Sequence, residues 1–149
     1  MFEILVIDDD KNTRRLMNAI LLGAGYKPVL AEDGEKALEI YNTHHVDMVI
    51  ADIMMPNLDG YEFTKILRKS NQDIPIIMVS AKELPDDRKK GFKAGIDDYL
   101  VKPVDEEECN VCILLCFGNS KLCKTFLADV FTECHFKSFR RICYSYIWH

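Results

Sequence analysis

The chain has 149 residues with 48% hydrophobic and 29% charged side chains, and its formal net charge at pH 7 is −5. This length and balance predict one globular domain with a buried core. No apolar run is long enough to span a membrane, and Met1-Phe2-Glu3 begins a strand rather than a signal peptide, so we expect a cytoplasmic protein. The acidic balance argues against general nucleic-acid binding.

The composition changes sharply near residue 109. Residues 1–108 carry 22 acidic and 14 basic side chains and no cysteine, whereas residues 109–149 carry 2 acidic and 5 basic side chains and all 6 cysteines. A last helix of the domain can still continue past this point to a stop at Gly118. We therefore expect a domain over residues 1–118 and an atypical Cys- and Phe-rich tail over residues 119–149. The tail is interpreted either as a helical segment for dimerisation or partner binding, or as an out-of-frame or truncated remnant of an effector domain.

Short apolar runs alternate along the chain with stretches of helical periodicity. We expect strands at residues 3–7, 27–31, 48–51, 74–79 and 98–101, and helices that begin near residues 11, 34, 60, 85 and 105. The expected buried faces of the first, second, third and fifth helices are, in that order, Leu16, Met17, Ile20 and Leu21; Ala37, Leu38 and Tyr41; Phe63, Ile66 and Leu67; and Val111, Leu114, Leu115 and Phe117. This alternation predicts an α/β fold, a doubly wound five-stranded parallel sheet with helices on both faces.

Polar side chains follow four of these strands at the point where each strand ends. Asp8 and Asp9 come after the first strand, Asp52 after the third, Ser80 after the fourth and Lys102 after the fifth. The carboxyl ends of parallel strands meet at one edge of the sheet, where ligands bind in open α/β folds. Neighbouring carboxylates repel one another unless a cation lies among them, and Mg2+ suits carboxylate and water ligands. The hydroxyl and the lysine indicate that a phosphoryl oxygen is also bound.

Each of these residues also has a purely structural interpretation. Asp9 or Asp10 can cap the helix that begins at residue 11, and Asp52 can cap a turn or the next helix. Ser80 can begin a turn, and Lys102 can be a solvated surface charge. The functional interpretation is favoured because these residue types occur together at the ends of the strands.

Over residues 2–108 the chain resembles the receiver domains of two-component response regulators. The motifs that carry the resemblance are the acidic pair after Ile-Leu-Val-Ile, Asp52 with the Met-Pro-Asn-Leu-Asp-Gly that follows it, Met-Val-Ser-Ala at 78–81, Ala-Gly-Ile-Asp-Asp-Tyr at 94–99 and Lys102-Pro103. The resemblance implies a flavodoxin-like sheet with strand order 2-1-3-4-5. It also implies that the Lys102–Pro103 peptide bond is cis.

The resemblance gives each residue of this edge a role. Asp52 accepts a phosphoryl group from the phosphohistidine of a sensor histidine kinase, Ser80 bonds to that group and Lys102 pairs with it. The implied ligands of Mg2+ are Asp8, Asp9, Asp52 and the main-chain carbonyl of Met54. The chemistry is directed at the protein itself, so we expect a signalling switch rather than a turnover enzyme.

The same resemblance implies a conformational switch made of Ser80 and Tyr99. Charge on Asp52 draws Ser80 inward, Tyr99 turns from outside to inside, and the surface of the fourth helix, fifth strand and fifth helix repacks for output. A homodimer through that surface is one expected form of output. Met54 and Lys82 are expected to tune the phosphoryl lifetime; because Met54 has no polar group to orient water, we expect a lifetime of many minutes or longer.

Three other functions remain as alternatives. A receiver-like module that only binds partners would keep the fold without accepting phosphate. A phosphatase of the haloacid dehalogenase type also forms an aspartyl phosphate, and Asp8-Asp9-Asp10 offers its Asp-x-Asp start, but Asn12 stands where that family has Thr or Val. A flavodoxin needs a hydroxyl-rich phosphate loop after the first strand, where this chain has acids.

The cysteines raise the question of a zinc site. The candidate ligands are Cys109, Cys112, Cys116, Cys123, Cys134 and His135. Their spacings do not form two paired knuckles, which argues against zinc, and a cytoplasmic location argues against structural disulfides. No recognition-helix motif follows Gly118, so we expect no direct DNA binding by this chain.

Overall fold

The computed structural model describes residues 1–81 and 85–118, without the side chains of residues 85–88, 117 and 118. The predictions for Lys82, for Phe117 as a buried side chain, for the tail over 119–149 and for its cysteines lie outside these residues. Among the described residues, no helix combines the length and the apolar character that a membrane span requires.

Five strands form one parallel sheet with the order β2-β1-β3-β4-β5. The strands are β1 (Glu3–Ile7), β2 (Lys27–Ala31), β3 (Met48–Asp52), β4 (Ile76–Ser80) and β5 (Asp98–Val101). The helices are α1 (Lys11–Gly23), α2 (Gly34–Thr43), α3 (Gly60–Ser70), α4 (Pro85–Ala94) and α5 (Glu106–Gly118). The predicted α/β fold, with the flavodoxin-like strand order, is confirmed.

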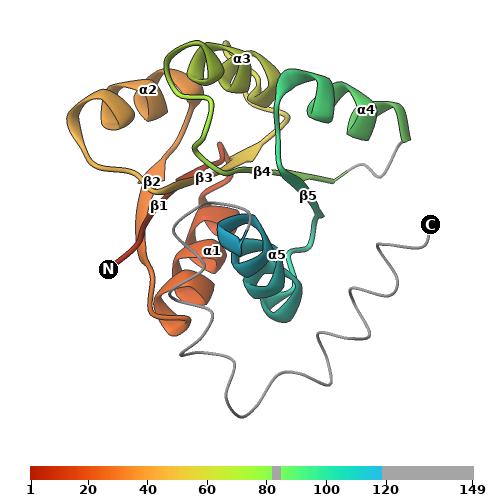
Figure 1. The fold of residues 1–149 in the computed structure, drawn as a ribbon. Helices are drawn as coiled ribbons and strands as arrows, with labels where there is room; N and C mark the ends of the chain where they lie inside the picture. Colours follow the sequence, from red (N-terminus) through yellow and green to blue (C-terminus); the bar gives the residue numbers. More distant parts are fainter. Residues whose placement is uncertain (82–84, 119–149) are drawn as a thin grey trace.

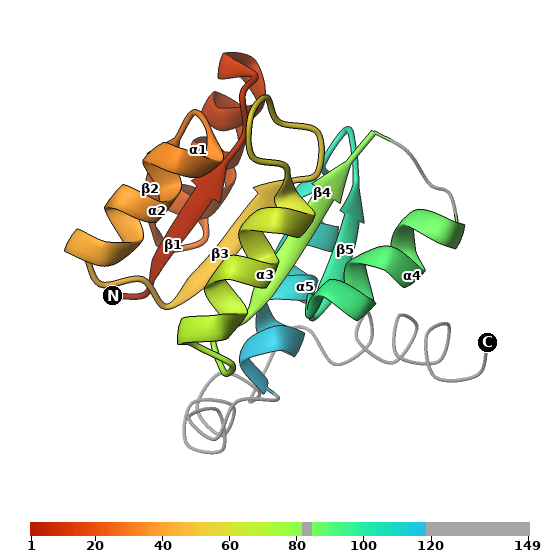
Figure 2. The ribbon, with the colours of Figure 1, turned by 90° about the horizontal axis from the view of Figure 1, so that it is seen from above.

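The sheet is covered on both faces, as a parallel sheet with crossover helices requires. Helices α2, α3 and α4 lie on one face, and α1 and α5 lie on the other (Figure 1). Figure 2 shows the strands side by side with α2, α3 and α4 in front of them. Both faces of the strands are therefore buried, which explains why β3 and β4 read as continuous apolar runs rather than as alternating ones.

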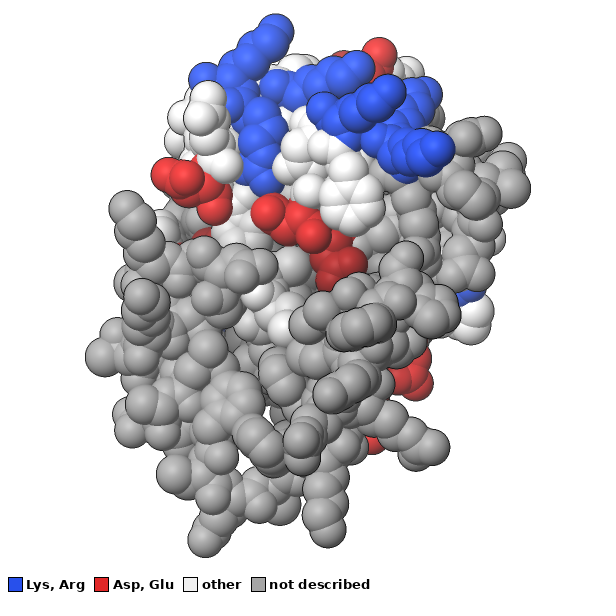
Figure 3. Space-filling view, turned by 45° about the vertical axis from the view of Figure 1, so that its right-hand side comes forward, with Lys and Arg blue, Asp and Glu red and all other residues white. Residues whose placement is uncertain are grey.

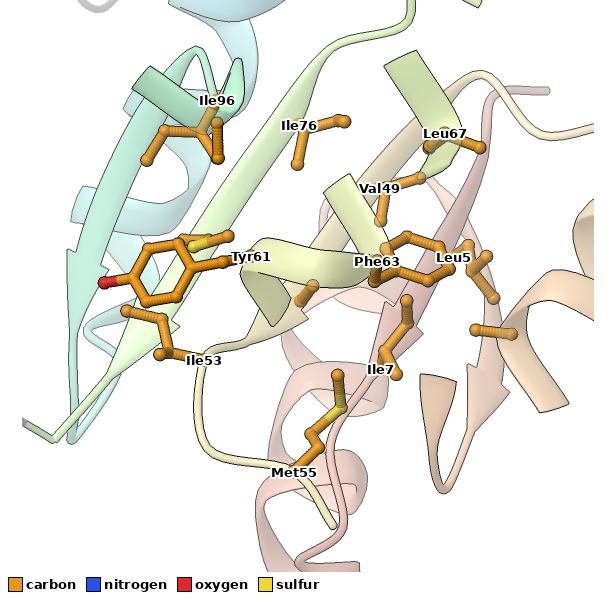
Figure 4. Close-up of a cluster of buried hydrophobic side chains, with 14 of the residues drawn as sticks. Leu5, Ile7, Val49, Ile53, Met55, Tyr61, Phe63, Leu67, Ile76 and Ile96 are labelled. Atoms are coloured by element: carbon orange, nitrogen blue, oxygen red, sulfur yellow. The ribbon is translucent and has the colours of Figure 1, made fainter. Parts of the chain in front are cut away.

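Alternate residues of each strand enter two separate cores. Leu5 and Ile7 of β1 pack under α2 and α3, whereas Ile4 and Val6 pack against α1 and α5. On the first face Phe63 of α3 is fully buried and lies next to Leu5 and Ile7 (Figure 4). Burying a phenylalanine contributes roughly 1.5–3 kcal/mol relative to leaving it exposed, so this contact fixes α3 against the strands that carry the polar edge.

Two apolar residues expected in the core are at the surface. Leu16 of α1 is 44% exposed and Ile66 of α3 is 41% exposed. Both predictions were wrong because each residue is followed directly by another apolar residue, and helical periodicity does not decide which of the two faces the sheet. Met17 and Leu67 are the buried members of these two pairs.

The buried stripe of α5 also differs from the predicted one. Its buried residues are Cys109, Cys112, Ile113 and Cys116, whereas Leu114 is exposed and Val111 and Leu115 are only partly buried. The spacing of 3, 4 and 7 residues places the buried four on one helical face. The cysteines act here as small apolar side chains, and all three thiols are free.

At the amino edge of the sheet, Arg68 of α3 joins three segments. Its Nε donates to the carbonyl of Gly95 at 2.8 Å, and its Nη1 donates to the carbonyl of Ile74 at 2.6 Å. Its Nη2 lies 3.0 Å from Asp97 Oδ2, which also accepts from the amide of Ile76 at 2.8 Å. The end of α3, the start of β4 and the turn between α4 and β5 are therefore held by one side chain, which we call the Arg68 clamp.

Positive charge gathers on the outer sides of α3 and α4 (Figure 3). The exposed lysines there are Lys65, Lys69, Lys89, Lys90 and Lys93. Lys90 Nζ lies 4.9 Å from the centre of the Tyr61 ring, which ties the start of α3 to α4 by a cation–π contact. This face is basic although the chain as a whole is acidic, so the net charge alone is a poor guide to what this face attracts.

Candidate functional site

Carboxylates from two strand ends meet at the carboxyl edge of the sheet. Asp8 follows β1 and Asp52 ends β3, and both are buried, whereas Asp9 is exposed. One ligand atom from each of Asp8, Asp9 and Asp52 can be chosen so that all lie within 4.8 Å of one another. The strands bring them together because β1 and β3 are neighbours in the sheet.

Lys102 lies between the two buried carboxylates. Its Nζ is 2.8 Å from Asp8 Oδ2 and 3.0 Å from Asp52 Oδ2. The residue follows β5, and the Lys102–Pro103 bond is cis, as the resemblance implies. One ammonium group thus neutralises part of the negative charge of two strand ends that lie on the same sheet edge.

Burial and hydrogen bonding act in opposite directions on the charges of Asp52 and Lys102. Burial raises the pKa of Asp52, and the hydrogen bond from Lys102 opposes that rise. Burial lowers the pKa of Lys102, but hydrogen bonds to Asp8 and Asp52 outweigh it and raise the pKa overall. The lysine therefore stays protonated and favours the ionised form of Asp52, which an oxygen nucleophile requires.

Main-chain amides fix the remaining oxygen of each buried carboxylate. Asp8 Oδ1 accepts from the amide of Asp10 at 2.8 Å, and Asp52 Oδ1 accepts from the amide of Met54 at 3.2 Å. Each buried carboxylate therefore has one oxygen on a loop amide and the other on Lys102. Asp10 is itself the N-cap of α1, which confirms one of the two cap residues considered from sequence.

The loop after β3 is held close to the strand that carries Asp52. The amide of Gly60 donates to the carbonyl of Ile53 at 3.0 Å, and the amide of Ile53 donates to Val79 at 3.1 Å. A Cβ atom on Gly60 would lie 2.5 Å from the carbonyl oxygen of Asp52. Only glycine fits this approach, so the start of α3 rests directly on the backbone of the site.

Ser80 lies at this edge, whereas Tyr99 lies two residues further back along β5, beside Met78 of β4. Ser80 is buried at the end of β4, and its carbonyl accepts from the amide of Lys102 at 2.8 Å. Tyr99 of β5 is 4% exposed and belongs to the core under α3 and α4. The Met54 side chain is 65% exposed, whereas Asp52, two residues before it, is 5% exposed.

One residue close to the site had no signal in the sequence. Arg14 Nη1 donates to the carbonyls of Asp8 and Asp9 at 2.7 and 3.0 Å. Its neighbour Arg15 is chemically identical but exposed. Helical periodicity alone does not separate the two, and only the course of the loop after β1 selects Arg14.

The sequence matches the family described as "Response regulator receiver domain" over residues 4–113. The chain belongs to this receiver family. "Probable transcriptional regulator ycf27" of Porphyridium aerugineum is 45% identical over 106 residues, which cover 71% of this chain and 44% of that protein. The chain thus spans less than half of the length of this curated relative.

Solved receiver structures share the fold. The receiver domain of the Francisella response regulator 1452 is 36% identical with a TM-score of 0.75, and the match covers 81% of this chain and 100% of that chain. The Thermotoga maritima response regulator TrrA, whose structure is described as a complex with Mg(2+)-BeF, is 34% identical with a TM-score of 0.71. That match covers 78% of this chain and 99% of TrrA.

The acidic group of this receiver domain fits a hard divalent cation. Its donors are carboxylate oxygens, which Mg2+ prefers, and the site has one exposed member, Asp9, through which water and ligands can reach it. Within residues 1–81 and 89–116, where side chains are described, this is the only group of three or more His, Cys, Asp or Glu that converges in this way. Cys109, Cys112 and Cys116 are buried in the core instead, which argues further against zinc at these three.

Proposed function

We propose that this receiver domain is a phosphorylation-controlled switch in which Asp52 accepts a phosphoryl group from a phosphohistidine of a sensor histidine kinase. The observation that carries the proposal is the ammonium group of Lys102, which lies within 3.0 Å of both Asp8 and Asp52. A buried pair of carboxylates that share one lysine is costly as a structural device, because burial penalises each charge. A function explains this free-energy penalty if Asp52 has to be a fixed, ionised nucleophile.

Asp8, Asp9, Asp52 and the main-chain carbonyl of Met54 would hold Mg2+. When bound, the cation neutralises negative charge on the transferring phosphoryl oxygens. The fit of carboxylate donors at this edge and the Mg(2+)-BeF complex described for TrrA support this assignment.

The transfer step uses the chain's own residues. A carboxylate oxygen of Asp52 forms a bond to phosphorus while the bond between phosphorus and the histidine nitrogen breaks, and the histidine leaves with the electron pair. Lys102 passes from the carboxylate to a phosphoryl oxygen, and the Ser80 hydroxyl donates to another. Water later attacks the phosphorus and restores Asp52, so the protein carries out one cycle on itself rather than turning over a free substrate.

Output would follow from a shift in packing around Ser80 and Tyr99. Tyr99 is already buried here, so the phosphoryl group would stabilise an inward state that this fold can adopt without it. The shift equals the difference in the phosphoryl group's interaction with the two states. We propose that the surface of α4, β5 and α5 then binds the next partner, with a homodimer as one form; transcriptional output by a longer protein is suggested by the name of the ycf27 relative.

The proposal is tested by intact-mass measurement after incubation with acetyl phosphate. Wild-type protein with Mg2+ should gain a single phosphoryl adduct, and omission of Mg2+ should abolish it. Asp52→Asn, which keeps the shape of the side chain, should gain none, while Asp9→Asn should slow the gain. An adduct that persists in Asp52→Asn would show that another residue is phosphorylated. A folded wild-type protein that gains no adduct would instead support a module that only binds partners.

Replacement of Met54 by asparagine should shorten the life of the phosphorylated form by about tenfold, because an amide that orients the attacking water lowers the entropic cost of hydrolysis. The Met54 side chain is exposed beside Asp52, so an amide at that position can orient a water molecule. Loss of the adduct is followed by mass after removal of acetyl phosphate, with Met54→Leu as the apolar control. Equal lifetimes for asparagine and leucine contradict the assigned role.

A further inference from the structure

We infer that Arg14 is a positioning residue of the cation site and acts through the peptide group between Asp9 and Asp10. The inference rests on the proposed function, because it assigns to Arg14 a part in Mg2+ binding at that site. The guanidinium group touches none of the three carboxylates in the hydrogen bonds of this structure. It contacts only the main chain that presents them, at the carbonyls of Asp8 and Asp9.

The same peptide group joins Arg14 to Asp8. The carbonyl of Asp9 accepts from Arg14 Nη1 at 3.0 Å, and the amide on the opposite side of that peptide, Asp10 N, donates to Asp8 Oδ1 at 2.8 Å. Because a trans peptide holds its oxygen and its hydrogen on opposite sides, fixing the oxygen also aims the N–H. Consecutive hydrogen bonds of this kind also polarise each other.

The second bond of Arg14 fixes the start of the loop. The carbonyl of Asp8 accepts from the same nitrogen at 2.7 Å. With both carbonyls held by α1, the loop turns Asp8 inward, where its side chain is buried, and leaves Asp9 exposed. Arg14 therefore helps to hold the Asp8 carboxylate in the orientation in which one oxygen accepts from the loop amide and the other contacts Lys102.

Charge and positioning predict opposite results when Arg14 is removed. By Coulomb's law alone, loss of a positive charge near a cation site strengthens Mg2+ binding. Loss of a group that orients a ligand weakens it, typically by 10–100-fold. Arg15 provides the matched control, because it carries the same charge on the next residue of α1 and is exposed.

The test is Mg2+ titration by calorimetry on the full chain, for wild type, Arg14→Ala, Arg14→Lys and Arg15→Ala. We expect Arg14→Ala to bind Mg2+ about tenfold or more weakly, and Arg14→Lys to recover part of the loss because its ammonium can still donate to a carbonyl. Arg15→Ala should bind as tightly as wild type or more tightly. Binding by Arg14→Ala that equals or exceeds that of the wild type overturns the inference.

A second measurement needs no metal and separates this inference from the proposed function. The amide proton of Asp10, observed by NMR in metal-free protein, should move upfield in Arg14→Ala because its hydrogen bond to Asp8 weakens, and it should stay in place in Arg15→Ala. An unmoved signal in a folded Arg14 variant overturns the link between Arg14 and Asp8. If wild type binds no Mg2+ at all, the proposed function fails, and the NMR result alone decides whether Arg14 orients the loop.

Discussion

Replacement of Gly60 by alanine is expected to lower the free energy of unfolding by about 3 kcal/mol. The added Cβ would lie 2.5 Å from the carbonyl oxygen of Asp52 and 3.0 Å from Cα of Ile53. Both neighbours are main-chain atoms, so no side-chain rotation relieves the overlap and α3 has to move away from β3. Urea unfolding followed by circular dichroism measures the loss.

Gly34 provides the control, since both glycines open a helix directly after an aspartate N-cap. The nearest atoms to a Cβ on Gly34 all belong to the side chain of Leu58, at 2.8 Å for Cδ2 and 3.0 Å for Cβ. Rotation of Leu58 relieves the first contact, and a shift of a few tenths of an ångström relieves the second. Gly34→Ala should therefore lower stability less than Gly60→Ala, because its overlap is with a side chain and not with main-chain atoms. Equal losses in the two variants would mean that the approach to Asp52 is not the cause.

The Gly60 substitution should also slow phosphorylation in the protein that still folds. A displacement of 1 Å at a reacting group can cost about 10²-fold in rate, and the overlap falls on the residue that carries the nucleophile. The rate of adduct formation with acetyl phosphate, measured on the folded fraction, should fall in Gly60→Ala and remain near the wild-type value in Gly34→Ala.

Raising the pH above 9 is expected to destabilise the domain steeply. Burial raises the pKa of Cys109 and Cys116 to about 12 from an ordinary value of 9.0, and it raises the pKa of Cys112 as well. Above the ordinary value the unfolded chain has released these protons while the folded chain retains them, so stability falls as pH rises. Their stabilising effect is complete below pH 9 and is lost between pH 9 and about 12.

The expected slope is large for a domain of this size. Each retained proton contributes about 1.4 kcal/mol per pH unit, so three thiols contribute about 4 kcal/mol per unit against a typical total stability of about 5–15 kcal/mol. Burial also raises the pKa of Tyr26 above its ordinary value of 10.0. Urea unfolding under reducing conditions is therefore measured between pH 8 and 10, where the thiols are the main source of the slope. Each of Cys109→Ala, Cys112→Ala and Cys116→Ala should flatten it by about 1.4 kcal/mol per unit. Identical slopes in all the variants contradict the prediction.

The arrangement of the sheet could be predicted because it depends on features that a sequence displays directly. Apolar runs bounded by Asp8, Asp52 and Lys102 mark strands and their ends, and parallel topology brings such ends to one edge. The family resemblance supplied the strand order and the cis bond at Lys102–Pro103, and the structure contains both.

The rest depended on docking, which periodicity leaves open. From Cys109 to Phe117 the helix is apolar on nearly all sides, so several stripes were equally consistent with a buried face. In the structure the buried stripe is the one that contains the three thiols, and these small side chains pack in the core between α5 and the sheet. Arg14 was missed for a related reason: its partners are carbonyl groups, and every residue has one.

The Arg68 clamp joins three segments on the edge of the sheet opposite the acidic group. It reaches the carboxyl end of α4, where the carbonyl of Gly95 accepts from Arg68 Nε. Within α4, Lys90 lies over the Tyr61 ring, so both α4 and the turn that follows it are joined to α3. The position of α4 therefore depends on that of α3, whose first residue lies against the backbone of Asp52.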